Sequence, residues 1–151
     1  LDSFYGTSEE KGLLEFIENS FGKLENRYKE IYLLRNEEVF KIYDFEKGRG
    51  FQPDFILFLK SKEKEDFESA KADVYYQIFI EPKGDQFKGN DNTFANGKEG
   101  WKEKFLEDIS IKYGFDQIIK SENQHFRLIG LPFYNKGHIK SFENRFKKLF
   151  E

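Results

Sequence analysis

Three charged residues, an aspartate and a glutamate–lysine pair, have the types and spacing that could support metal-dependent hydrolysis. Asp54 precedes an apolar run at 55–59, and Glu81 and Lys83 follow another apolar run at 78–80. Glu81 and Lys83 are two positions apart, so on a strand both side chains leave the same face. Charges at the ends of buried strands cost free energy unless they have a partner. A divalent cation is a suitable partner.

The chemistry that these residues could perform is hydrolysis of a phosphodiester. It needs a metal that polarises the phosphate, a nucleophilic water and positive charge for the transition state. Mg²⁺ takes oxygen ligands, usually one or two carboxylates with water and the phosphate itself. Asp54 and Glu81 are the candidate carboxylates, and the carbonyl of Pro82 could complete the shell. Lys83 is the candidate catalytic residue that orients the water and stabilises developing charge, so Asp54, Glu81 and Lys83 form the predicted catalytic set.

Periodicity and turn residues predict the elements that must position these residues. Helices are predicted over 8–21, ending near Gly22, over about 101–114 and over about 139–149. Strands are predicted over 30–35, 38–45, 51–60, 74–82 and 126–133, with a short one over 115–119. Residues 61–73 are predicted to form a solvated hairpin loop and 84–100 a mobile loop. The order predicts a mixed α/β domain with one central sheet.

Composition indicates one globular domain and excludes several classes of site. The 151 residues are enough for a single core, and 19 Phe and 8 Tyr argue against disorder. Without cysteine there are no disulfides, zinc–thiolate sites or cysteine nucleophiles. The net charge of −3 does not favour nucleic-acid binding, although the segment 136–148 carries five basic residues and one acid.

The apolar runs, of about five residues, are far too short to cross a membrane, and no signal peptide is visible. The chain begins at Leu1 and contains no methionine. We therefore interpret residues 1–151 as a single domain cut from a longer polypeptide.

The two charged segments carry a family resemblance. Pro53-Asp54 followed by Glu81-Pro82-Lys83, in this element order, resembles the PD-(D/E)xK nuclease superfamily. More narrowly, GFQPDFILFL at 50–59 and YQIFIEPKG at 76–84 resemble the C-terminal nuclease domain of type III restriction enzymes. The superfamily likeness spans nearly the whole chain by element order, and the specific strings fall within 30–84. Proline inside the E-x-K triplet departs mildly from the superfamily pattern and leaves the chemical residues intact.

The resemblance implies a restriction-endonuclease-like fold in which Asp54 and Glu81 bind Mg²⁺, or Mn²⁺ as a substitute, and Lys83 is catalytic. It implies an endonuclease that cuts double-stranded DNA in the prokaryotic cytoplasm, as the cleavage module of a type III restriction–modification enzyme. Many relatives add a glutamate from the first helix, for which Glu10 is the candidate, with Glu15 behind it. A helicase-like motor is expected in the same full-length polypeptide and a methyltransferase subunit as a partner. Cutting both strands needs two such sites, so activity could require a dimer.

Other interpretations stay open. The same residues could belong to a catalytically inactive domain of this fold that docks nucleic acid or protein, or to a purely structural cation site. Glu10 also has a structural explanation, since Thr7 and Glu10 form a T-x-x-E capping box. The loop lysines Lys88, Lys98 and Lys102 could contact DNA phosphates. The sequence has no GxxxxGK(S/T) phosphate loop, so no ATP site is expected in this chain.

Overall fold

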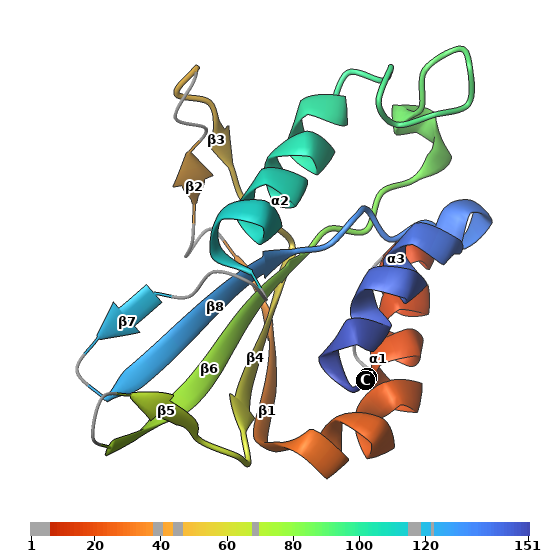
Figure 1. Cartoon of the computed structure of the whole chain (residues 1–151). Coiled ribbons are helices and arrows are strands. Elements are labelled where there is room, and N and C mark those ends of the chain that lie inside the picture. Colours follow the sequence, from red (N-terminus) through yellow and green to blue (C-terminus); the bar gives the residue numbers. More distant parts are fainter. Residues whose placement is uncertain (1–6, 38–40, 44–46, 68–69, 115–118, 122) are drawn as a thin grey trace.

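A computed structural model describes residues 7–37, 41–43, 47–67, 70–114, 119–121 and 123–151, which form one main sheet with helices on both faces (Figure 1). The helices are α1 (Ser8–Arg27), α2 (Gly100–Tyr113) and α3 (Ile139–Phe146), with 3₁₀ turns η1 (Asp85–Phe87), η2 (Lys136–His138) and η3 (Lys147–Leu149). The strands are β1 (Tyr28–Arg35), β2 (Ile42–Tyr43), β3 (Gly50–Phe51), β4 (Phe55–Ser61), β5 (Glu65–Phe67), β6 (Ala70–Ile80), β7 (Ile119–Ser121) and β8 (Gln124–Gly130). The predicted mixed α/β class is confirmed.

The order and register of the strands determine which chain segments meet. The main sheet has the order β1-β4-β6-β8-β7, and β5 also pairs with β6. β4 is antiparallel to both β1 and β6, whereas β8 runs parallel to β6. Phe55, the first residue of β4, is paired with Ile80, the last residue of β6. The residue before β4 and the residue after β6 are therefore brought to the same edge of the sheet.

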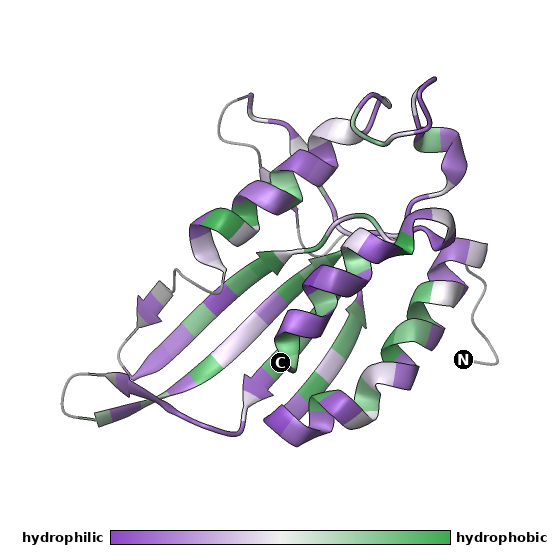
Figure 2. Ribbon diagram, turned by 45° about the vertical axis from the view of Figure 1, so that its right-hand side comes forward, coloured by the Kyte–Doolittle hydropathy of each residue, from purple (hydrophilic) through white to green (hydrophobic). Residues whose placement is uncertain are grey.

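Each face of the sheet has its own apolar core. On one face, α1 and α3 lie side by side (Figure 2). Leu13 of α1 and Phe142 of α3 are fully buried in the core on this face. On the other face, α2 packs through Leu106 over Ile56 and Phe79. The apolar residues 55–59 of β4 and 78–80 of β6 contribute side chains to both cores, whereas burial alternates along the earlier part of β6.

Helix α1 begins at the predicted residue but ends beyond its predicted end. The side chain of Thr7 accepts a hydrogen bond of 3.2 Å from the backbone N–H of Glu10, as its capping pattern predicts. The helix continues through Gly22 to Arg27, so the predicted end near Gly22 is wrong. Leu24 is fully buried against the sheet, and this burial outweighs the weak helix preference of an exposed glycine.

Two predicted strand boundaries also need correction. The predicted strand over 51–60 is divided into β3 and β4, because Pro53 has no N–H to donate and its carbonyl accepts from the side chain of Asn36. Asp54 therefore lies just before β4 and not on it. The predicted loop over 61–73 contains β5 and the start of β6, which form a hairpin that pairs Glu65 with Ala72.

Residues 84–100, which the sequence predicts to be a mobile loop, pack against the core. The segment contains η1, and Phe94 is 8% exposed and packs edge-on against Phe133. Of the predicted strand over 38–45 the structure describes 41–43, of which 42–43 form β2, and of the predicted strand over 115–119 it describes the last residue, in β7. Residues 38–40, 44–46 and 115–118 lie outside the described residues.

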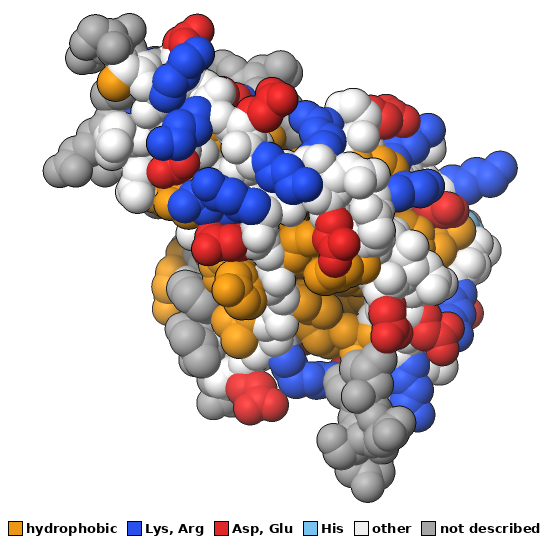
Figure 3. All heavy atoms as spheres, turned by 90° about the horizontal axis from the view of Figure 1, so that it is seen from below, with side chains coloured by type: hydrophobic (Ala, Val, Ile, Leu, Met, Phe, Trp, Pro, Cys, Tyr) orange, Lys and Arg blue, Asp and Glu red, His pale blue; other side chains and the backbone are white. Residues whose placement is uncertain are grey.

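Seen from below, hydrophobic side chains occupy a hollow at the centre of the molecule, and charged side chains of both signs surround it (Figure 3). Among the described residues, no helix has the length and apolar character needed to cross a membrane.

The course of α1 through Gly22 predicts a stabilising substitution. A Cβ at this exposed helical position would meet no atom within 4 Å, so Gly22→Ala should raise the free energy of unfolding by about 0.5–1 kcal/mol in urea denaturation. Gly12→Ala is the matched control, because its Cβ would lie 2.4 Å from Cε of Lys136 and the gain should be smaller. Destabilisation by Gly22→Ala would contradict a continuous helix.

Candidate active site

The end of β6 and the segment before β4 bring two of the predicted acids together. The backbone N–H of Asp54 donates a hydrogen bond of 2.8 Å to Oε1 of Glu81. This contact continues the antiparallel register, in which Phe55 faces Ile80, by one further position. The glutamate is 4% exposed, so its carboxylate lies inside the protein beside the start of β4.

Lys83 lies on the same side as Glu81, as their spacing predicts. Its Nζ donates 2.9 Å to Oε2 of Glu81 and 2.8 Å to Oε1 of Glu99. The backbone keeps strand geometry past the end of β6, because Tyr134 donates to the carbonyl of Glu81 and accepts from the N–H of Lys83, each at 2.9 Å. Two residues of an extended chain therefore present their side chains to one cleft.

Pro82 is buried between these two residues and forms a parallel bridge with Tyr134. Proline has no N–H to donate, but its neighbours on both sides, Glu81 and Lys83, keep their backbone hydrogen bonds to Tyr134. Below this bridge, Asn135 is fully buried and its side-chain amide donates 2.8 Å to the carbonyl of Lys83. Hydrogen bonds to Tyr134 and Asn135 therefore hold the whole segment 81–83, which carries the lysine, in position.

The predicted residues line a cleft of about 520 Å³ between the start of α1 and the end of β6. Its walls are the residues Thr7, Ser8, Glu9, Glu10, Asp54, Glu81, Pro82, Lys83, Gly84, Asp85, Gln86 and Phe87. Glu10 belongs to this cleft, but its carboxylate pairs with the guanidinium of Arg35 at 2.6 Å. In the described ranges, no group of three or more His, Cys, Asp or Glu side chains is arranged to hold a metal. The structure thus brings Asp54, Glu81 and Glu10 to one cleft, with Glu10 engaged by Arg35. Glu15, the second candidate, does not line the cleft.

Burial, together with the charge of a neighbouring acid, raises the pKa of both Asp54 and Glu81. Burial, and then the negative charge of Asp54, raise the pKa of Glu81 to about 7 in spite of the neighbouring lysine. Burial, and then the charge of Glu10, raise the pKa of Asp54. Burial favours the neutral amine of Lys83, yet Glu81 and Glu99 outweigh it and hold the pKa of Lys83 above its usual value. The site contains more negative charge than its single buried lysine balances.

This set of donors fits a magnesium-type cation. Two carboxylates, with oxygen as the only donor element, match the usual protein contribution to Mg²⁺, whose remaining positions are filled by water and phosphate. Raised carboxyl pKa values mark a place where a positive charge would stabilise the ionised forms. Asp54 and Glu81 would hold the ion, and Pro82, whose carbonyl the sequence offers as a further ligand, lines the same cleft.

Sequence reasoning missed Glu99. This residue precedes α2, and 16 positions separate it from Lys83, so no spacing pattern links the two. Its carboxylate also pairs with Lys102, and hydrogen bonds from both lysines lower its pKa against the opposing effect of burial. Two of the lysines considered for DNA contact have acidic partners: Lys102 pairs with Glu99, and Lys88 pairs with Asp85. The side chain of Lys88 is only 6% exposed. Lys98 is exposed.

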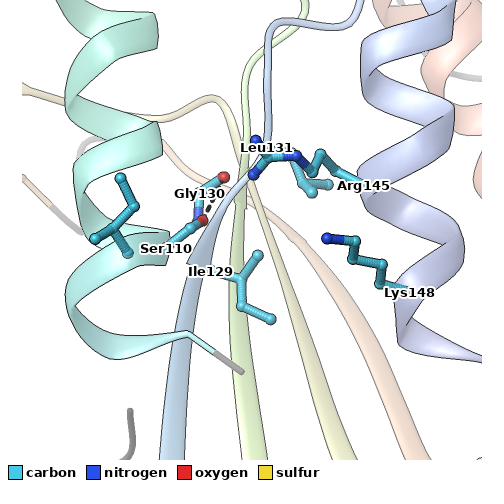
Figure 4. Close-up of a pocket in the computed structure, with 7 residues that line it drawn as sticks. Ser110, Ile129, Gly130, Leu131, Arg145 and Lys148 are labelled. Atoms are coloured by element: carbon cyan, nitrogen blue, oxygen red, sulfur yellow. Dashed lines mark hydrogen bonds between the residues drawn. The ribbon is translucent and has the colours of Figure 1, made fainter. Parts of the chain in front are cut away.

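A second hollow, of about 340 Å³, lies between α2, the end of β8 and the C-terminal helical segment (Figure 4). Ser110 both donates to the carbonyl and accepts from the N–H of Gly130 there, which covers the edge of β8. Arg145 and Lys148 point toward the hollow, and Arg145 pairs with Glu107. None of the predicted site residues lines it.

Comparison with known proteins places the chain in a family. The model of the HI_1054_C family, described as a C-terminal domain, matches residues 1–151. The chain belongs to the HI_1054_C family. An uncharacterized protein of Haemophilus influenzae (strain ATCC 51907 / DSM 11121 / KW20 / Rd) is 44% identical over 152 residues. The match covers 99% of this chain and 31% of the relative, so this HI_1054_C domain spans about a third of that protein. No solved structure matches the chain.

The raised pKa of Glu81 predicts a pH-dependent stability in metal-free protein. Between its usual pKa of 4.5 and about 7, the folded state holds a proton that the unfolded state releases, so stability must fall as pH rises through this window. The wild type should lose about 3 kcal/mol relative to Glu81→Gln between about pH 4 and about pH 8, measured by urea denaturation in EDTA.

The exposed Glu18→Gln is the control for that experiment, and its difference from the wild type should stay constant across the same pH range. A parallel pH dependence in the wild type and Glu81→Gln would show that the buried carboxyl has an ordinary pKa.

Proposed function

We propose that this chain is a Mg²⁺-dependent endonuclease domain with a restriction-endonuclease-like fold. The observation that carries the proposal is one cluster: Glu81 accepts hydrogen bonds from the N–H of Asp54 at 2.8 Å and from Nζ of Lys83 at 2.9 Å. Metal-dependent hydrolysis of a phosphodiester needs acids to bind the metal and a positive charge. Here one acid precedes a strand, and a second acid and a lysine follow the neighbouring strand. The mixed sheet flanked by α1, α2 and α3 agrees with that fold.

Each residue has a distinct role in this proposal. Asp54 and Glu81 hold the metal ion, which would polarise the scissile phosphate and provide an activated water when bound. Lys83 keeps its charge through its carboxylate partners, so its ammonium stabilises negative charge that develops on the phosphate. Rings of Phe87 and Phe133 lie 4.6 and 5.5 Å from Nζ, and these apolar neighbours strengthen the electrostatic interactions of the lysine.

We propose double-stranded DNA as the substrate, as in the cleavage module of a type III restriction–modification enzyme. Lys98, Lys136 and Lys140 are exposed and are candidates for salt-dependent contacts with the DNA backbone. The family description as a C-terminal domain and the threefold greater length of the relative agree with a cleavage module that follows other domains. The ATP-driven motor of the same polypeptide, the methyltransferase partner and a dimer for double-strand cleavage belong to this proposal.

A second candidate is a catalytically inactive domain of the same fold that docks nucleic acid or protein. One observation favours it: the side chains of Lys83 and Glu81 are only 8% and 5% exposed, as in a structural ion pair. Metal affinity separates the candidates, because an inactive module with a structural pair needs no cation. Calorimetric titration without measurable Mn²⁺ binding at millimolar metal would favour the docking module.

Two substitutions test the roles of the metal-binding and catalytic residues. Lys83→Ala should retain Mn²⁺ binding in calorimetry but lose cleavage of plasmid DNA, by about 100-fold or more, because the charge that stabilises the transition state is absent. Asp54→Ala should lose both metal binding and cleavage, since one of two carboxylate ligands is removed.

Asp108→Asn, an exposed change on the outer side of α2, is the control and should cut like the wild type. Far-ultraviolet circular dichroism and thermal melting establish that each variant is folded. Undiminished nicking by Lys83→Ala would reject the catalytic role of the lysine.

A further inference from the structure

The two carboxylate partners of Lys83 are Glu81 and Glu99, and a metal ion in the cleft would affect them differently. Oε1 of Glu81 accepts from the N–H of Asp54, so this glutamate is beside the other metal-binding candidate. Glu99 approaches the lysine from α2 and does not line the cleft that contains Asp54 and Glu81. A cation on Glu81 would repel the ammonium of Lys83 and compete for the carboxylate that holds it.

The side chain of Glu99, which lies just before α2, does not cap the helix. Glu99 is the N-cap residue of α2, yet its side chain makes no capping hydrogen bond. Its two carboxylate oxygens instead face two ammonium groups, those of Lys83 and Lys102. An N-cap residue that serves only the helix directs its side chain to the first backbone N–H groups.

The surroundings hold Glu99 in place. Lys102 lies 5.3 Å from the ring centroid of Phe51 and is 21% exposed, so the pair is partly shielded from solvent. Leu106, one turn further along α2, is fully buried and anchors the helix to the sheet. The distance between Glu99 and Lys83 is thus set by the packing of a helix.

We propose that Glu99 is the positioning residue of Lys83. If a metal ion were bound to Glu81, the hydrogen bond to Glu99 would still keep the ammonium of Lys83 in its present position at the cleft. Lys83 is 8% exposed and lies against two phenylalanine rings, so water cannot readily replace a lost carboxylate partner. This inference rests on the proposed function, because it assigns Glu99 to the same site.

The first test needs no metal and no activity. A lysine ammonium held by carboxylates gives a protected signal in ¹H–¹⁵N spectra of labelled protein, whereas a free one exchanges with water too fast to be seen. Replacing Glu81 by Ala imitates the loss of this partner, and the Lys83 signal should persist in that variant. It should disappear in Glu81→Ala/Glu99→Ala, and Lys83→Arg identifies the signal. Where Glu81→Ala does not fold, the isosteric Glu81→Gln takes its place.

The second test is kinetic. In single-turnover cleavage with saturating Mg²⁺ and DNA, Glu99→Ala should slow the reaction about 10- to 100-fold, as for a displaced catalytic group. Its Mn²⁺ affinity should change less than about twofold, because Glu99 is no metal ligand. Glu99→Gln, which keeps an acceptor oxygen, should recover part of the rate, and Asp108→Asn should leave it unchanged.

The outcomes separate the two proposals. Disappearance of the Lys83 signal in the single Glu81 variant would overturn the role of Glu99, whatever the activity. A cleavage rate unaffected by Glu99→Ala would overturn it as well. A wild type that binds metal without cutting DNA, with the Lys83 signal held by Glu99, would overturn the nuclease proposal alone.

Discussion

The site depends on an electrostatic imbalance at one end of the sheet. Glu81 is almost fully buried, and the nearby charge of Asp54 raises the pKa of Glu81 against the opposing influence of Lys83. A buried carboxylate is tolerated in a folded protein only when it is protonated or when a cation neutralises its charge. In the metal-free chain the restoring groups are the ammonium of Lys83 and the N–H of Asp54. The same arrangement is suited to accept a divalent ion.

Strand pairing and core packing in the remainder of the structure position these charged side chains. The antiparallel register of β4 and β6 brings the two acids together, and the backbone pairing of Tyr134 with the residues around Pro82 carries strand geometry past the end of β6. The cores on both faces of the sheet hold these strands rigidly. Glu99, at the start of α2, adds a second carboxylate from a distant part of the chain to the ammonium of Lys83.

The sequence predicted the features that depend on local patterns. The spacing of Glu81 and Lys83 predicted their common side, and apolar periodicity predicted the helices and the buried strands. It did not predict contacts that depend on packing between distant segments. Glu99 pairs with Lys83 only because the segment before α2 folds back over the sheet, and Glu10 pairs with Arg35 because α1 lies beside β1. The end of α1 was mispredicted for a related reason, since the burial of Leu24 is a tertiary effect.

A crystal structure of the wild-type domain soaked in Mn²⁺ would show whether Asp54 and Glu81 bind the same cation. We expect an anomalous-scattering peak within about 2.2 Å of a carboxylate oxygen from each acid, with Lys83 still in contact with Glu99. An empty cleft, or a peak in contact with only one of the two acids, would rule out a shared cation.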